Sequence, residues 1–139
     1  MSIRVAYVRK PDERLVNEVA RRLDEYNVRH IQMPVDDRIV ALAADQSGEL
    51  VGGAIAYSQW GYLSLEVLWV DEDQRRHGIG ARLMHVIEEE GRQRGCHSAH
   101  TDTFTFQAPS FYLSLGYEVF GQLEGYAAGQ TRYYLVKRL

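Results

Sequence analysis

The segment between Tyr62 and Thr103 restricts the fold of this chain more than any other. Tyr62–Val70 is rich in β-branched, aromatic and aliphatic residues and predicts a strand, and the apolar spacing within Gly78–Arg94 predicts an amphipathic helix that ends at Gly95. A short strand is expected again at Ala99–Thr103. A strand, a helix and a strand in this order make a βαβ unit, so the two strands are expected to be parallel, with a right-handed crossover.

The rest of the chain predicts antiparallel strands and two further helices. The first helix is expected to begin at Pro11 and Asp12, and the second is expected to run from Pro109 to Gly116. The remaining features are strands at Ile3–Arg9, Ile39–Ala44, Leu50–Tyr57, Tyr117–Leu123 and Thr131–Val136, a hairpin turn at Asp45–Gly48, an irregular connection at Val28–Asp37, and an apolar face of Leu15, Val19, Leu23 and Tyr26 on the first helix. We therefore expect an α+β fold with a mixed, mostly antiparallel sheet flanked by helices around the βαβ unit, in a single domain over residues 1–139.

Composition argues against several classes of protein. A net charge of −3 gives no overall basic surface for nucleic acid, and no apolar run approaches the roughly 18 residues that predict a membrane span. Cys96 is the single cysteine, so an intramolecular disulfide and a cysteine-rich zinc site are both excluded. His30, His85 and His97 have no metal-ligand spacing. We expect a cytoplasmic protein without a metal and without a nucleic-acid or membrane partner.

The loop Asp73–Gly80, which joins the long strand to the long helix, has an unusual charge pattern for a helix start. Helix N-termini favour Asp, Asn, Ser or Thr caps and acidic first turns, because their N–H groups are unpaired and the helix dipole is positive there. Here Arg75–His77 crowd that end, and no capping side chain stands beside Gly78. A bound anion would remove the conflict, and Gly78 and Gly80 would let the backbone approach it. The alternative is a solvated basic turn in which glycine merely eases helix–strand packing.

The residues of this loop also carry a family resemblance. Arg75–Gly80 reads R-R-H-G-I-G and matches the Q/R-x-x-G-x-G/A signature of the GNAT superfamily of acyl-CoA-dependent N-acetyltransferases, whereas Leu83 stands where a dinucleotide-binding loop has its third glycine. The later segment Ala108–Tyr117, with Tyr112 four residues before Gly116, resembles a later helix of the same family. The order of strands and helices resembles the family over nearly the whole chain. The segments Asp102–Gln107 and Arg132–Leu139 also resemble a subgroup of short bacterial members.

The resemblance implies acetyl-CoA as co-substrate and no metal. In such a protein the pantetheine arm bonds to the backbone of the first central strand, and the pyrophosphate lies at the start of the following helix. The implied cofactor-binding residues are Leu68, Trp69 and Val70 on the strand, Arg75, Arg76, His77, Gly78, Ile79 and Gly80 in the loop, and Ser110 further on. The chain departs from the pattern at Gln107 and Pro109, in the stretch where many relatives carry Asn, which puts contacts from that loop in doubt.

Two residues are predicted to catalyse the transfer. Tyr112 resembles the tyrosine that protonates the departing CoA thiolate, and a phenol with a reference pKa of about 10 keeps its proton at neutral pH. Glu66 interrupts an apolar strand near the expected position of the acetyl group, so it is the first choice as proton acceptor. An outward-facing Glu66 paired across the sheet is the alternative, and Asp102 and His100 on the partner strand are second choices as base.

The predicted reaction is direct acetyl transfer, in a ternary complex, to the primary amine of a small molecule. Two alternatives stay open: acetylation of a protein N-terminus or lysine, and a non-catalytic acyl-CoA-binding protein. Tyr57, Trp60 and Tyr62 form either an aromatic wall for a cationic amine or ordinary packing. Val28–Asp37 is expected to help form the acceptor pocket. A homodimer through the C-terminal strands is compatible with the resemblance, although no residue demands it.

Overall fold

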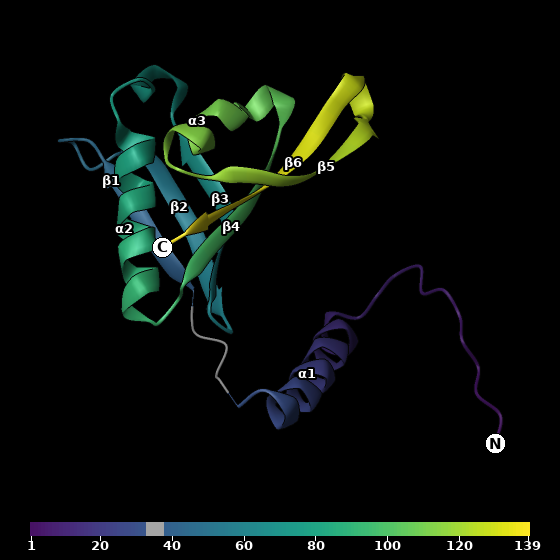
Figure 1. Ribbon diagram of the computed structural model, residues 1–139. Helices are drawn as coiled ribbons and strands as arrows, with labels where there is room; N and C mark the ends of the chain where they lie inside the picture. Colours follow the sequence, from purple (N-terminus) through teal and green to yellow (C-terminus); the bar gives the residue numbers. More distant parts are fainter. Residues whose placement is uncertain (33–37) are drawn as a thin grey trace. The chain divides into compact units, whose positions relative to one another are not determined.

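The computed structural model describes residues 1–32 and 38–139, which fall into two units, Met1–Pro34 and Val35–Leu139. The second unit is built on a six-stranded mixed sheet (Figure 1). In spatial order the strands are β1 (Ile39–Ala44), β2 (Leu50–Gln59), β3 (Tyr62–Val70), β4 (Ser98–Phe104), β6 (Gln130–Arg138) and β5 (Glu118–Tyr126). Every neighbouring pair is antiparallel except β3 and β4, which are parallel.

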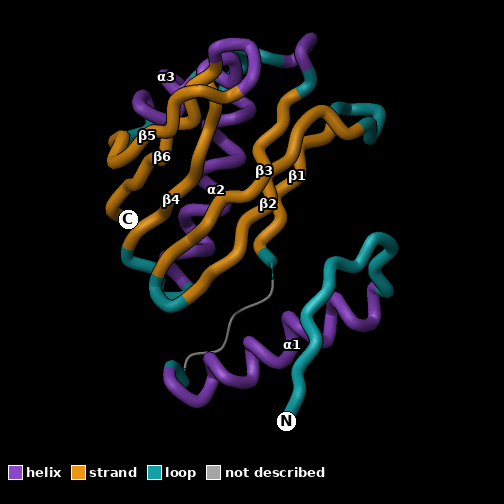
Figure 2. Tube along the Cα trace, turned by 90° about the vertical axis from the view of Figure 1, so that its right-hand side faces the viewer, coloured by secondary structure: helices purple, strands orange, loops and turns teal. Residues whose placement is uncertain are grey.

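Helix α2 (Ile79–Gln93) connects the two parallel strands and covers one face of the sheet. Figure 2 shows α2 and the short helix α3 (Pro109–Ser114) on the same side of the strands. The βαβ unit and the α+β class predicted from the sequence are therefore confirmed. The described residues 38–139 also contain three short 3-10 segments: η1 (Glu72–Gln74), η2 (Thr105–Gln107) and η3 (Ala127–Gly129).

The core lies between α2 and the sheet. Helical spacing places Met84, Ile87 and their neighbour Leu83 on the buried side of α2, and strand alternation turns Leu63 and Leu65 of β3 towards them. Burying one such side chain stabilises the fold by about 1.5–3 kcal/mol, so this layer holds α2 against the central strands.

The hairpin turn between β1 and β2 confirms its sequence signal. The Asp45 carboxylate accepts hydrogen bonds from the N–H groups of Ser47 (2.8 Å) and Glu49 (3.0 Å), and Gly48 adopts a positive φ of 87°. A short acidic side chain followed by glycine is the pattern that such a turn requires, because the first satisfies the turn's amides and the second accepts left-handed backbone.

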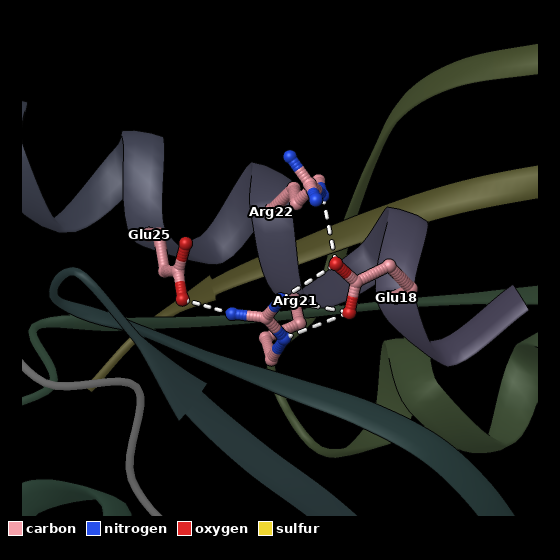
Figure 3. Close-up of polar contacts among 4 residues, drawn as sticks. All are labelled: Glu18, Arg21, Arg22 and Glu25. Atoms are coloured by element: carbon pink, nitrogen blue, oxygen red, sulfur yellow. Dashed lines mark hydrogen bonds and ion pairs between the residues drawn. The ribbon is translucent and has the colours of Figure 1, made fainter. Parts of the chain in front are cut away.

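The first unit contains helix α1 (Glu13–His30), as predicted. Asp12 caps it, since its side chain accepts a hydrogen bond from the Arg14 N–H at 2.9 Å. Figure 3 shows the ion pairs along its exposed surface: Glu18 contacts Arg21 (2.7 Å) and Arg22 (2.8 Å), and Arg21 also contacts Glu25. These exposed pairs are screened by solvent and contribute little. The predicted apolar face, Leu15, Val19, Leu23 and Tyr26, is exposed.

The prediction for the N-terminal segment is wrong in one respect and incomplete in another. Residues 3–9 form no strand, because the described residues 1–32 offer no second extended segment to pair with. The connection expected from Val28 begins later, since α1 continues to His30, and its part at residues 33–37 lies outside the described residues. No helix in the described part of the chain is long and apolar enough to cross a membrane. The single-domain organisation stays a prediction.

Candidate active site

The site is a cleft that opens where β3 and β4 separate. The two strands pair at only three positions, Tyr62 with Ser98, Leu63 with Ala99 and Ser64 with His100. The Thr101 hydroxyl then donates to the Leu65 carbonyl at 3.2 Å, and beyond this bond the strands diverge. Between them lies an open cavity of about 960 Å³, within the range of small-molecule sites. The unpaired edges of a parallel pair thus become the walls of a binding site.

Glu66 lies in that wall at a β-bulge. Ile55 of β2 pairs with Val67, whereas the next residue, Ala56, pairs with Leu65, so Glu66 is the extra residue that no residue of β2 faces. A bulge redirects side chains and is common beside active sites. Glu66 is exposed and lines the cavity, and no ion pair to it occurs among the described residues. The alternative of a glutamate paired across the sheet is therefore not supported.

The start of α2 is left without a side-chain cap. Gly78 precedes it in the left-handed conformation, with φ of 74° and no capping hydrogen bond. The N–H groups of Ile79, Gly80 and Ala81 have no preceding helical carbonyl to bond to, and all three residues line the cavity. A Cβ at Gly78 would meet no atom within 4 Å, so the space beside this backbone is open. A helix N-terminus with free N–H groups and open space beside it can accommodate an anion.

The basic residues before Gly78 differ in what they contact. The Arg75 side chain turns back and donates from Nε to the Val70 carbonyl at 3.1 Å, which ties the loop to the end of β3. Arg76 has a positive φ of 68° and lines the cavity. The His77 ring lies 3.1 Å from the Gln74 carbonyl through Nδ1 and does not line the cavity. The loop is thus held by the Arg75 and His77 side chains, while the N–H groups of Ile79, Gly80 and Ala81 have no helical partner.

Glycine at position 80 is also needed for packing, which the sequence did not indicate. A Cβ there would lie 3.1 Å from Cζ of Phe111, so this glycine lets α3 approach the first turn of α2. Phe111 in turn contacts the ring of Tyr112 edge-on, with centroids 5.1 Å apart. The glycine predicted to admit an anion therefore also places the predicted catalytic tyrosine.

Tyr112 lines the cavity and is buried, with 7% of its surface exposed. Burial raises the pKa of its phenol to about 12, the negative charge of Asp102 adds to the rise, and a hydrogen bond with Thr101 opposes it. The proton therefore stays on Tyr112 throughout the neutral range. The contact with Thr101 puts the phenol close to the point where β3 and β4 separate.

Asp102 lines the opposite wall from Glu66 and is ion-paired. Its Oδ1 accepts a hydrogen bond from Arg132 Nε (3.0 Å) and lies 2.9 Å from Nη2 of the same guanidinium, on the neighbouring strand β6. Burial lowers the pKa of the His100 imidazole, and the negative charge of Asp102 partly offsets this shift. His100 itself does not line the cavity and stacks edge-on near Tyr62, with ring centroids 5.8 Å apart.

A buried polar network lies behind Tyr112. Glu88 of α2, 4% exposed, accepts from the Tyr117 hydroxyl (2.8 Å) and from Lys137 Nζ (2.7 Å). The Tyr117 ring packs edge-on against Tyr112, with centroids 5.8 Å apart, and burial with the charge of Glu88 raises the Tyr117 pKa. The network links α2 and β6 to Tyr117 in the segment after α3, and removal of one partner would leave a buried polar group unpaired.

Most of the predicted site residues lie together. The cavity is lined by Glu66, Leu68, Trp69, Val70, Arg75, Arg76, Gly78, Ile79, Gly80 and Tyr112. His77 and Ser110 do not line it, and their contact with a cofactor stays a prediction. Tyr57, Trp60 and Tyr62 also lie outside the lining, so an aromatic wall made of these three is not supported.

Sequence reasoning missed several residues of the site. Thr101, Thr103, Phe106 and Phe111 line the cavity, and Arg132 and the Glu88 network support it. Glu88 had a readable signal, because it falls four residues after Met84 on the apolar face of its helix. Arg132 had none, since its partner is 30 residues away in the chain. The described residues contain no group of three or more His, Cys, Asp or Glu side chains that could hold a metal ion.

Comparison with known proteins agrees with this geometry. The profile of the acetyltransferase (GNAT) family matches residues 8–117. The blasticidin-S acetyltransferase of Streptomyces morookaense is 39% identical over 98 residues, which cover 70% of this chain and 72% of that protein. A crystal structure of an acetyltransferase from Bacillus cereus ATCC 14579 has a TM-score of 0.81 at 26% identity and covers 96% of this chain and 98% of that chain. An aminoglycoside 6'-N-acetyltransferase complexed with coenzyme A has a TM-score of 0.66 at 26% identity, covering 81% and 77%.

The chain therefore belongs to the GNAT family of acetyltransferases, and it is an acyl-CoA-dependent N-acetyltransferase with acetyl-CoA as its acyl donor.

Proposed function

We propose that the protein transfers the acetyl group of acetyl-CoA directly to a primary amine of a small molecule, within a ternary complex. The observation that carries this proposal is the cavity between β3 and β4, which is lined both by an uncapped helix start and by the buried Tyr112, whose raised pKa keeps it protonated. The names of similar proteins, a blasticidin-S and an aminoglycoside acetyltransferase, support a small-molecule acceptor over a protein N-terminus or lysine.

The start of α2 fits the diphosphate of the donor. Three backbone N–H groups without helical partners and the positive end of the helix dipole favour an anion, and Gly78 leaves room for one. The pantetheine arm would then run along β3, where the backbone of Leu68, Trp69 and Val70 borders the cavity. Binding in this direction brings the thioester towards Thr101 and Tyr112.

Glu66 is proposed as the proton acceptor. A lysine-type amine has a pKa of about 10.4, so freeing its lone pair at pH 7 costs about 4.6 kcal/mol. A carboxylate in the wall that has no ion-pair partner among the described residues can take this proton, directly or through a water. Deprotonation and positioning against the thioester would then be the protein's main contributions to the attack.

Tyr112 is proposed to assist the departure of the CoA sulfur. A thiol has a reference pKa of about 8.5, so complete proton transfer from a phenol with a pKa of about 12 would be uphill by about 5 kcal/mol. We therefore assign Tyr112 a hydrogen bond to the sulfur that strengthens as negative charge develops in the transition state. The raised pKa keeps this donor protonated up to about pH 11, so turnover should not fall on the alkaline side through Tyr112 below that pH.

Release of free thiol from acetyl-CoA in the presence of a panel of amines tests the proposal. Tyr112→Phe should lower kcat about 100-fold while the Kd of acetyl-CoA changes little, and Tyr57→Phe, a tyrosine outside the cavity, is the matched control. Unchanged turnover in Tyr112→Phe would remove its assignment.

For Glu66, the measurement is the pH–rate profile of Glu66→Gln, with Glu49→Gln on the distant hairpin as control. Loss of the limb that rises towards high pH is expected, and a retained limb argues against Glu66 as the base. Tight acetyl-CoA binding without thiol release from any amine would instead support a non-catalytic binding protein.

A further inference from the structure

Arg132 is fixed on several sides next to the cavity. Its guanidinium group lies 5.7 Å from the ring centroid of Phe104 and 5.1 Å from that of Tyr134, and Nη1 donates to the Tyr126 hydroxyl at 3.4 Å. Its hydrogen bond and its ion-pair contact to Asp102 both involve Oδ1. The aromatic rings on which the guanidinium packs and the polar contacts that it makes together restrict the conformations of the Arg132 side chain.

Arg132 holds the carboxylate of Asp102 in one orientation. Asp102 lines the cavity, whereas Arg132 does not, so the guanidinium supports the carboxylate from outside the binding space. Oδ1 is occupied by Arg132, and no hydrogen bond to Oδ2 occurs among the described residues. A carboxylate held in one orientation with one oxygen available can accept a charge-assisted hydrogen bond from a cationic ligand.

Glu66 and Asp102 stand on the two different strands that border the cavity and differ in their surroundings. Glu66 has no ion-pair partner in the described chain, as suits a group that gains and loses a proton, while Asp102 is clamped, as suits a group that orients a ligand. Trp69 and Phe106, 44% and 72% exposed, line the same cavity and add aromatic faces for a cation.

We propose that Asp102, positioned by Arg132, binds a second cationic group of the acceptor, so that the preferred acceptors carry an ammonium or guanidinium group in addition to the amine that is acetylated. This inference rests on the proposed function, which names the reacting amine but not the rest of the acceptor. Asp102 is the specificity-determining residue, and Arg132 is a positioning residue because it acts only through Asp102.

The first test compares matched pairs of acceptors with the wild-type protein. Each pair is a linear α,ω-diamine and the alkylamine of equal chain length, taken over a series of lengths, with thiol release as the readout. A charge-assisted hydrogen bond predicts that kcat/KM of the diamine exceeds that of the alkylamine about ten- to hundredfold at the best length, mainly through KM. Equal values at every length would overturn the inference without any variant.

The second test uses variants of the clamp. Asp102→Asn should reduce the diamine-to-alkylamine ratio at least about tenfold, and Arg132→Met should reduce it in the same direction without removing any residue from the cavity wall. The double variant should lose no more than Asp102→Asn alone, because the two residues act as one unit. Glu124→Gln, an exposed carboxylate on β5 outside the cavity, is the control that should keep the ratio.

Calorimetry of the same amine pairs with the CoA-loaded protein separates this inference from the proposed function. Diamine-selective binding without acetylation would contradict the proposed reaction and leave the inference standing. Acetylation of amines with an unchanged diamine-to-alkylamine ratio in Asp102→Asn would support the proposed reaction and contradict the inference. Thermal melting and acetyl-CoA binding of each variant identify one that fails to fold, and the wild-type comparison remains decisive in that case.

Discussion

The starts of the two long helices solve the same physical problem in opposite ways. Asp12 stands before α1 in extended backbone, its side chain accepts from the Arg14 N–H, and Glu13 adds a negative charge in the first turn. Gly78 stands before α2 in the left-handed conformation, with no side-chain cap and no acidic residue in the first turn. Both helices expose unpaired N–H groups at this end, but only α1 pairs one with its own sequence.

The presence of a side-chain cap at α1 and its absence at α2 indicate which helix start is available to a ligand. The cap of α1 completes the helix by itself, so nothing further is required there. At α2 the positive side chains of the loop lie beside the positive end of the helix dipole, and a bound anion would offset this repulsion. Gly78, which has open space beside its backbone, lines the cavity. The missing cap at the start of α2 therefore supports the proposed anion site there.

The strongest test of the comparison gives α2 an acidic residue at its start. Gly78→Asp should weaken acetyl-CoA binding about 100-fold, because a carboxylate would occupy the anion position and repel the diphosphate. Gly48→Asp is the matched control: Gly48 also has a positive φ (87°) and open space around its Cβ position, but lies in the β1–β2 turn. Isothermal titration calorimetry measures both, and equal effects of the two variants would break the comparison.

A second test follows amide hydrogen exchange. Saturating acetyl-CoA should slow exchange at Ile79, Gly80 and Ala81 about tenfold or more, because their N–H groups would gain a hydrogen-bond partner. The corresponding amides at the start of α1 should not change. Equal protection at both helix starts, or none at α2, would contradict an anion site there.

A third test removes charge and keeps the loop backbone. Arg76→Gln should weaken acetyl-CoA binding about threefold at low salt and less at high salt, because exposed charges are screened. Arg92→Gln, near the other end of α2, should leave the Kd unchanged. Fluorescence or calorimetric titrations at two ionic strengths measure this, and a salt-independent loss would point to loop distortion instead of charge.

The smallest effect is expected at α1. Asp12→Ala should lower helicity slightly by circular dichroism and leave acetyl-CoA binding unchanged. Hydrogen bonds from Arg14 lower the Asp12 pKa below its ordinary value of 3.8, so the cap contributes fully above that pH and is lost as pH falls through the lower folded value. Helicity lost already near neutral pH would contradict Asp12 as the cap.

Much of the site was predictable because its signals are local. The loop Arg75–Gly80, its unfavourable charges and its glycine at the helix start are consecutive in the sequence. The β-branched, aromatic and aliphatic residues of Tyr62–Val70 indicated the strand beside it. Local propensity also misled at residues 3–9, which resemble a strand yet form none among the described residues. A strand depends on a partner, and a partner is not a local property.

The sequence by itself determined the order of helices and strands in residues 38–139 and the uncapped start of α2. Only the tertiary structure decided that Glu66 occupies a β-bulge, that Arg132 clamps Asp102, and that Lys137 meets Glu88 across 49 residues. The physical reason is range. Helix periodicity, caps and turns depend on neighbours a few residues apart, whereas register, cavity walls and buried charge pairs depend on which distant segments pack together.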